Sequence, residues 1–181
     1  MPGSELAWDV RIGQSLGVFP ALANRPGLGE VSALEADLRP FIRRGGKVLM
    51  YIGWNDTAIP PLDSVRYYRS LVATTGKKAA DEGIRFFAIP DMGHCPANPT
   101  AATGYFFDPI PIVTAWRERR QKPNQIVVTH KTRTVADRSM TVCPYPQHAV
   151  YGGTGSRADA GNFACEDSPR WLTIGKTRLS R

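Results

Sequence analysis

Two short apolar runs, each followed by a loop with a chemically active side chain, constrain the fold of this chain more than any other feature. Residues 47–61 (KVLMYIGWNDTAIPP) carry Asp56 after their apolar part, and residues 84–95 (IRFFAIPDMGHC) carry His94. An apolar run without polar alternation is typical of a strand buried on both faces of a parallel sheet. We therefore expect two neighbouring buried strands, with Asp56 and His94 in the loops that follow them.

Helical patterns surround the two runs. A capping box of Ser32 and Glu35 predicts a helix that begins there, and Pro40 predicts that this helix is short or kinked. A second helix is expected between the first loop and Gly76. The apolar positions of a third helix are Ile110, Val113 and Trp116. The order helix, strand, helix, strand, helix predicts βα units around a parallel sheet, which is an α/β fold.

The two ends of the chain differ from this middle part. Residues 1–31 are rich in glycine and proline and predict loop or edge structure. Residues 126–130 predict one more short strand, and from residue 141 onward Gly, Pro, Ser and Asp predict a loop. The glycines of YGGTGSRADAG also suggest a phosphate-binding loop, but no strand precedes them and no Gly-Lys-Ser/Thr follows, so an ordinary loop is favoured.

Composition excludes several classes of protein. The 181 residues suffice for one domain with a sizeable core, and no apolar run approaches the roughly 20 residues that span a bilayer. The first residues, MPGSELAWDVRIG, lack the pattern of a signal peptide. The net charge of +7 is dispersed except at residues 117–122, which favours a solvated basic face over nucleic-acid binding.

Asp56 and His94 suggest two members of a nucleophile, base and acid triad. A serine hydroxyl needs an imidazole to take its proton, and a carboxylate at Nδ1 holds the imidazole in the right tautomer. The two residues are 38 positions apart, which allows one strand–helix–strand crossover to bring their loops together. Each has a plainer alternative, because an aspartate after a strand is often a turn residue or helix cap and a histidine after glycine is often structural.

The cysteines and the other histidines add little on their own. Three cysteines suggest one pair and one left over. His94, His130 and His148 are too scattered to indicate a zinc site, and no Cys-x-x-Cys is present.

Three motifs resemble the tannase and feruloyl esterase family of α/β-hydrolase-type serine esterases: GGKVLMYIGWNDTAIPP, IPDMGHC and CPYPQ…FAC. The resemblance implies that Asp56 is the triad acid and His94 the base. It also implies a disulfide between Cys143 and Cys165, which would close the C-terminal loop. Cys95 stands where the family has the cysteine that pairs with the one before the nucleophilic serine, so its partner is expected outside this chain.

The family's nucleophile motif, Gly-Cys-Ser-x-Gly-Gly, does not occur in these 181 residues. The resemblance therefore implies that the strained turn that exposes the serine and forms part of the oxyanion hole is not supplied by these residues. Ser15 lies in a Gly-x-Ser-x-Gly sequence at residues 13–17, but that sequence lacks the cysteine and the double glycine of the family motif. The serines of the chain are Ser4, Ser15, Ser32, Ser64, Ser70, Ser139, Ser156, Ser168 and Ser180. The family's lid domain, with its calcium site, is also missing, so no cofactor is expected in this chain.

We therefore expect the C-terminal third of such an esterase, inactive alone. In this interpretation residues 1–31 follow the absent lid, residues 32–140 are the C-terminal part of the α/β-hydrolase core, and residues 141–181 are a disulfide-closed loop and tail. The resemblance implies esters of aromatic acids as substrates, the missing N-terminal portion as partner, and a secreted or periplasmic protein without nucleic-acid or membrane partners. The alternative is a non-catalytic remnant or binding module with a basic C-terminal third.

Overall fold

The computed structural model describes residues 36–94, 103–132 and 135–167. The chain divides into two units, residues 1–36 and 37–181, and the helices and strands below all lie in the second. In chain order they are α3 (Arg39–Arg43), β1 (Val48–Gly53), α4 (Pro61–Thr75), α5 (Lys77–Gly83), β2 (Ile84–Ile89), β3 (Thr103–Phe106), α6 (Pro109–Arg119), β4 (Ile126–Thr132), β5 (Val135–Val142), β6 (His148–Tyr151), the 3₁₀ helix η2 (Ala160–Asn162) and β7 (Phe163–Glu166).

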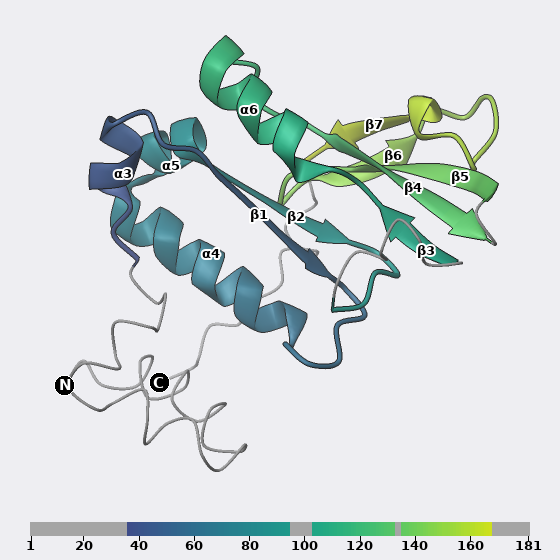
Figure 1. Ribbon diagram of the computed structural model, residues 1–181, viewed down its shortest axis with the longest axis horizontal. Helices are drawn as coiled ribbons and strands as arrows, with labels where there is room; N and C mark the ends of the chain where they lie inside the picture. Colours follow the sequence, from purple (N-terminus) through teal and green to yellow (C-terminus); the bar gives the residue numbers. More distant parts are fainter. Residues whose placement is uncertain (1–35, 95–102, 133–134, 168–181) are drawn as a thin grey trace. The chain divides into compact units, whose positions relative to one another are not determined.

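The two predicted strands are both present, as β1 and β2. They pair in parallel, from Val48 opposite Ile84 to Gly53 opposite Ile89. Helices α4 and α5 connect them, so the expected crossover is also present (Figure 1). The prediction that both strands are buried on both faces holds for β2 but is wrong for β1, most of which is only half-buried and whose Tyr51 is exposed.

Each face of the β1–β2 pair has its own core, because successive side chains of a strand point to opposite faces. On one face, Ile52 and Phe86 pack with Val65 of α4. On the other face, Phe87 and Ile89 pack with apolar residues of β4 and β5. Helices α4 and α6 lie on opposite sides of the pair (Figure 1).

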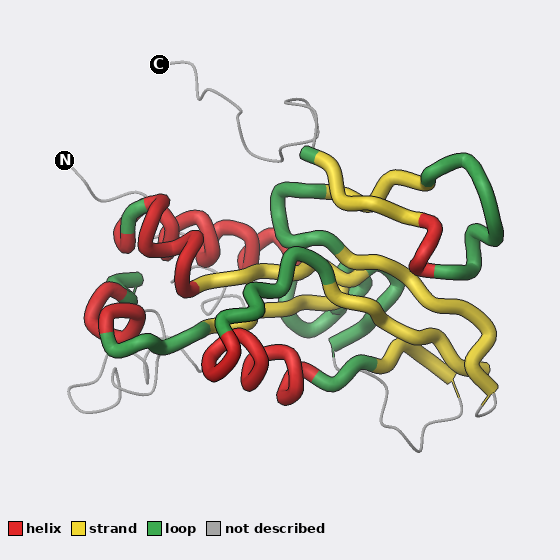
Figure 2. The backbone as a smooth tube through the Cα atoms, turned by 90° about the horizontal axis from the view of Figure 1, so that it is seen from above, coloured by secondary structure: helices red, strands yellow, loops and turns green. Residues whose placement is uncertain are grey.

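The prediction of a parallel sheet fails beyond β2. Strands β3, β4 and β5 form an antiparallel sheet in the order β3-β4-β5, and β6 pairs antiparallel with β7. Only two residues separate β4 from β5, and a link that short joins antiparallel strands, because a parallel pair needs a crossover of a dozen residues or more. Figure 2 shows the α-helices towards one end of the described residues and the antiparallel strands, with η2 among them, at the other.

The first helix also differs from its prediction. It begins at Arg39, and the residues 36–38 before it are not helical. The physical reason is Pro40, whose ring is tolerated only in the first turn of a helix. The predicted capping box of Ser32 and Glu35 lies outside the described residues. In α6, Trp116 is buried as expected, but Ile110 is exposed.

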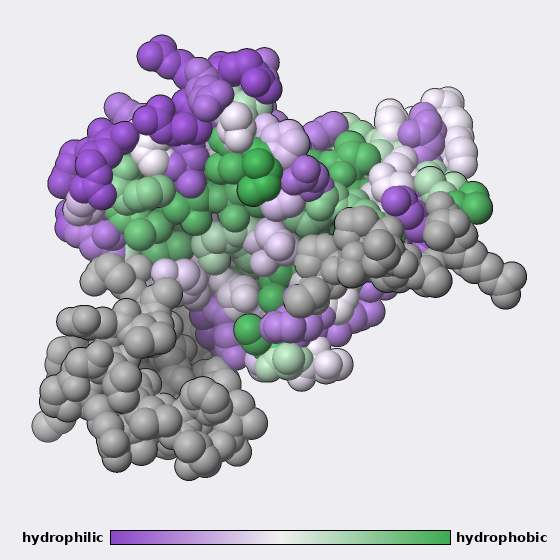
Figure 3. Space-filling view, in the orientation of Figure 1, coloured by the Kyte–Doolittle hydropathy of each residue, from purple (hydrophilic) through white to green (hydrophobic). Residues whose placement is uncertain are grey.

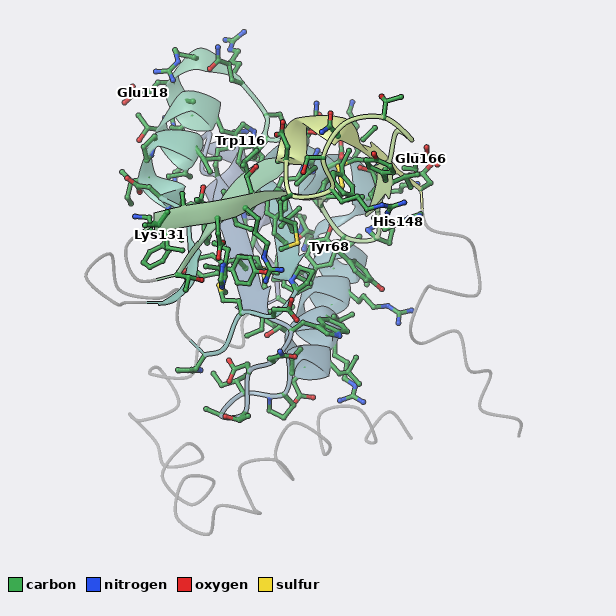
Figure 4. The ribbon with its side chains drawn as sticks, turned by 90° about the vertical axis from the view of Figure 1, so that its right-hand side faces the viewer. Tyr68, Trp116, Glu118, Lys131, His148 and Glu166 are labelled. Atoms are coloured by element: carbon green, nitrogen blue, oxygen red, sulfur yellow. A yellow bond between two sulfur atoms is a disulfide. The ribbon has the colours of Figure 1, made fainter. Side chains whose placement is uncertain are left out.

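The predicted loop between Cys143 and Cys165 contains regular structure instead. Strands β6 and β7 pair through four residues on each side, with His148 opposite Glu166 (Figure 4). The hydroxyl of Thr141 donates to the carbonyl of Ala160 at 2.9 Å and anchors η2 to β5. The glycine-rich stretch is therefore the connection between two paired strands.

Candidate active site

The carboxyl ends of β1 and β2 lie side by side because the strands are parallel and stay in register to their last residues. Two backbone hydrogen bonds join the loops that follow. The N–H of Trp54 donates to the carbonyl of Ile89 at 2.8 Å, and the N–H of Asn55 donates to the carbonyl of Met92 at 3.0 Å. Ligands and catalytic groups of α/β proteins gather at this edge of the sheet.

The loop after β1 fixes the side chain of Asp56. Its carboxylate has an exposed fraction of 0%. Oδ1 accepts hydrogen bonds from the backbone N–H groups of Ala58 at 2.8 Å and Ile59 at 2.9 Å. A carboxylate that bonds the backbone a few residues further on closes a turn of the Asx type. Asp56 is thus a turn residue, and its other oxygen remains for a second contact.

That second contact is with His94. Oδ2 of Asp56 lies 2.9 Å from Nδ1 of His94. An ionised carboxylate can only accept a hydrogen bond, so the proton sits on Nδ1 and Nδ1–H is the donor. The His94 side chain is 51% exposed, and within the described residues its Nε2 has no hydrogen-bond partner. In this tautomer Nε2 carries a lone pair that can accept a proton.

Opposing influences set the pKa of the Asp56 carboxyl. Burial is the largest and raises the pKa, since it disfavours the charged form. The N–H of Ile59, the ring of His94 and the N–H of Ala58 act in the other direction and outweigh burial, so the pKa lies below its ordinary value of 3.8. Asp56 is therefore ionised at neutral pH and stabilises an imidazolium at His94 when one forms.

These two side chains can act as acid and base, and the described residues offer no nucleophile beside them. No described serine is hydrogen-bonded to His94. The hydroxyls of Ser139 and Ser156 accept hydrogen bonds from backbone N–H groups of the β5 to β7 region instead. Within the described residues the site therefore consists of a proton acceptor, His94, and the carboxylate that orients it, Asp56.

The predicted disulfide between Cys143 and Cys165 is present, with Cα atoms 5.6 Å apart. Cys95, whose partner is expected outside this chain, lies outside the described residues. Within the described ranges no group of three or more His, Cys, Asp and Glu side chains could hold a metal ion. The helices that the structure describes are all too short or too polar to cross a membrane.

Sequence reasoning missed a second histidine–aspartate pair, on β4 and β5. Nδ1 of His130 lies 2.6 Å from Oδ1 of Asp137, and the Thr132 hydroxyl donates to Oδ2 of Asp137 at 2.6 Å. The pairing of β4 with β5 brings these residues together. A prediction of the strand at residues 135–142 would have placed Asp137 beside His130. The charged residues within that strand hid its pattern in the sequence.

Comparison with known proteins gives a consistent family. A family model described as "Tannase and feruloyl esterase" matches residues 25–166. An uncharacterized esterase of Xanthomonas campestris is 34% identical over 82% of this chain, and the mono(2-hydroxyethyl) terephthalate hydrolase of Piscinibacter sakaiensis is 38% identical over 76%. The crystal structure of feruloyl esterase B from Aspergillus oryzae superposes on 81% of this chain with a TM-score of 0.66 and 28% identity.

These matches cover most of this chain but only a small part of each relative. This chain spans 31% of the Xanthomonas esterase, 22% of the terephthalate half-ester hydrolase and 32% of the feruloyl esterase structure. The similarity therefore concerns about a third or less of each relative.

Proposed function

Because the chain belongs to the tannase and feruloyl esterase family, we propose that Asp56 and His94 are the acid and base of a serine carboxylic ester hydrolase. The observation that carries the proposal is the 2.9 Å contact between the buried Asp56 carboxylate and Nδ1 of the half-exposed His94. The nucleophilic serine comes from a part of the enzyme outside these 181 residues.

The chemistry follows from the tautomer. Nε2 of His94 takes the proton of the serine hydroxyl as its oxygen attacks the acyl carbon of the ester. The imidazolium, stabilised by Asp56, gives this proton to the departing alcohol. His94 then takes a proton from water, the hydroxide attacks the acyl-enzyme, and the acid leaves as the serine regains its proton.

The names of the relatives support a substrate class. They include a tannase, feruloyl esterases and a terephthalate half-ester hydrolase, all named for esters of aromatic acids. We assign the same class to this protein. An oxidising compartment, extracellular or periplasmic, goes with the disulfide between Cys143 and Cys165.

A chimera tests the assignment. Residues 25–166 would replace the matching segment of the Piscinibacter hydrolase, which supplies the remainder of the enzyme. We expect hydrolysis of p-nitrophenyl esters, a loss of about 10³-fold or more in kcat for His94→Ala, and a smaller loss for Asp56→Asn.

The matched control is Asp63→Asn, which removes a carboxylate paired with Arg66 on the surface of α4 and should leave kcat unchanged. The isolated chain should show no turnover. Activity of the chimera or of the isolated chain that survives His94→Ala would refute the proposal.

A further inference from the structure

A cavity of about 490 Å³ lies among β5, the β6–β7 pair and the residues that follow β2. Asp56 and His94 do not line it, so it is separate from the candidate active site. Its volume falls within the range of small-molecule sites, roughly 300–1,000 Å³. Apolar side chains form part of its wall, among them Met140 and Val142 of β5 and Phe163 of β7.

The charged side chains at this cavity are unbalanced. Arg138 of β5, Arg157 of the β6–β7 connection and Asp91 after β2 line it. Within the described residues neither arginine forms an ion pair with a carboxylate, whereas Arg39, Arg66 and Arg85 each have an acidic partner. A second carboxylate, Asp137, lies near Arg138, but both of its oxygens are engaged by His130 and Thr132. The lining itself thus carries two arginines and one carboxylate, which favours an anionic ligand.

Aromatic rings hold both guanidinium groups in place. Arg138 lies over the ring of Tyr105, with 5.5 Å between its Cζ and the ring centroid, and Arg157 lies over Tyr151 at 4.1 Å. A stacked guanidinium loses less side-chain freedom when it binds a ligand, because part of that freedom is already lost.

The backbone brings the two arginines to the same place. The residues that follow them are joined by a hydrogen bond from the N–H of Ser139 to the carbonyl of Ala158, at 2.8 Å. Arg138, Met140 and Val142 also alternate along β5, which places cationic and apolar side chains on the same face of the strand.

We propose that this cavity binds a small aromatic carboxylate. The carboxylate lies between the guanidinium groups of Arg138 and Arg157, whose planar donors match its two oxygens. The ring lies against the apolar wall of Met140, Val142 and Phe163. This inference does not depend on ester hydrolysis, because the cavity and the catalytic pair share no residue.

The probe is benzoate, titrated into the oxidised 181-residue chain and followed by calorimetry and by amide chemical shifts. Saturable binding is expected. Arg138→Gln and Arg157→Gln should each weaken it by about tenfold or more. Arg119→Gln, which removes an exposed arginine of α6 outside the cavity, should leave it unchanged, and benzamide, with the same ring and no charge, should bind at least about tenfold more weakly.

Three results would overturn the proposal. The first is that benzoate shows no saturable binding. The second is that Arg138→Gln and Arg157→Gln fold as the wild type does, with unchanged amide spectra in the absence of benzoate, and still bind benzoate as tightly as the wild type. The third is that benzamide binds as tightly as benzoate. His94→Ala separates this site from the catalytic one. Undiminished benzoate binding by that variant supports the cavity, and lost binding places the carboxylate at His94 and contradicts the inference.

Discussion

Gly53 allows the loops that carry Asp56 and His94 to touch. A Cβ atom at this position would overlap the backbone carbonyl oxygens of Met92 and Gly93. Backbone cannot swing aside as a side chain can, so the two loops would have to separate. The short distance between the Asp56 carboxylate and the His94 ring thus depends on a glycine that contacts neither side chain's polar atoms directly.

We expect Gly53→Ala to lower the free energy of unfolding by about 1–3 kcal/mol, the usual cost of overpacking. Chemical denaturation measures this. Gly93→Ala is the matched control, because a Cβ there meets nothing within 4 Å. Equal stability of the two variants would show that the loops do not need the close approach.

Sequence reasoning singled out Asp56 and His94 as candidates because their titratable side chains follow two apolar runs, and the family resemblance implied their roles. It could not identify the N–H groups of Ala58 and Ile59, which hold the carboxylate, since every residue except proline carries such a group. The pair of His130 and Asp137 escaped because it depends on the register between two strands, of which only one was predicted.

Among the helices, α6 has the best-defined ends. Asp108 caps its first turn by accepting from the N–H of Ile110, and Arg120 closes it in the left-handed conformation with φ of 59°. A residue other than glycine or asparagine in that conformation lowers the stability of the folded state by about 1–2 kcal/mol.

Arg120→Gly should therefore raise the free energy of unfolding, by up to about 1 kcal/mol. The backbone N–H of residue 120 still donates to Ala115. Arg119→Gly, one residue earlier and inside the helix, should lower the free energy of unfolding by about 1 kcal/mol. Urea denaturation of both variants checks this, and effects of the same sign would contradict it.

The β4–β5 hairpin contains a carboxylate that responds to pH. Hydrogen bonds from Thr132 and then His130 lower the pKa of Asp137 below its ordinary value. Because the folded-state pKa is the lower one, Asp137 contributes stability above the unfolded-state value of about 3.9 and loses it as pH falls through the folded-state pKa.

Asp137→Asn should therefore lower the melting temperature at pH 6 and reduce the loss of stability between about pH 5 and pH 2. Thr132→Val, which keeps the carboxylate and removes one donor, should reduce that loss only in part. Melting curves across this pH range decide the matter, and an unchanged pH dependence in Asp137→Asn would rule out the contribution.

Elements with strong apolar periodicity or an uninterrupted apolar run were predictable, namely β1, β2, β4, α4 and α6. Helix α5 was not, because it begins directly after Gly76, the residue that ends α4. Strands β5, β6 and β7 are rich in polar and small residues. They form through antiparallel pairing, and the strand-favouring residues that they contain, such as Val150 and Tyr151 of β6, are too few to mark a strand in the sequence.

At the scale of the whole described region, one disulfide links two parts of the antiparallel half: it joins Cys143, directly after β5, to Cys165 in β7. Cys143 and Cys165 are 22 positions apart. In the chain-entropy description, closing a loop of this size stabilises the folded state by about 3 kcal/mol, because it restricts the unfolded chain.

The double variant Cys143→Ala/Cys165→Ala should lose about this amount of unfolding free energy, about 3 kcal/mol. Dithiothreitol should destabilise the wild type similarly and leave the double variant unaffected. A double variant as stable as the oxidised wild type would show that the β6–β7 region holds together without the bond.

Large apolar side chains reach the surface around β1 and the loop after it. Tyr51, Trp54, Ile59 and Leu62 are all at least 36% exposed, and the view of Figure 3 shows hydrophobic residues at the surface across the middle of the described region. The apolar run of β1 predicted a strand buried on both faces, whereas most of β1 is half-buried and Tyr51 is exposed.

The most direct test of the account is the protonation state of the His94 ring. Long-range ¹H–¹⁵N spectra at pH 8 would report which ring nitrogen carries the proton. We expect a proton on Nδ1 in the wild type, bonded to Asp56, and a shift towards the Nε2–H tautomer in Asp56→Asn. A wild-type ring with its proton on Nε2, or a tautomer ratio that Asp56→Asn leaves unchanged, would contradict the assignment of these residues as acid and base.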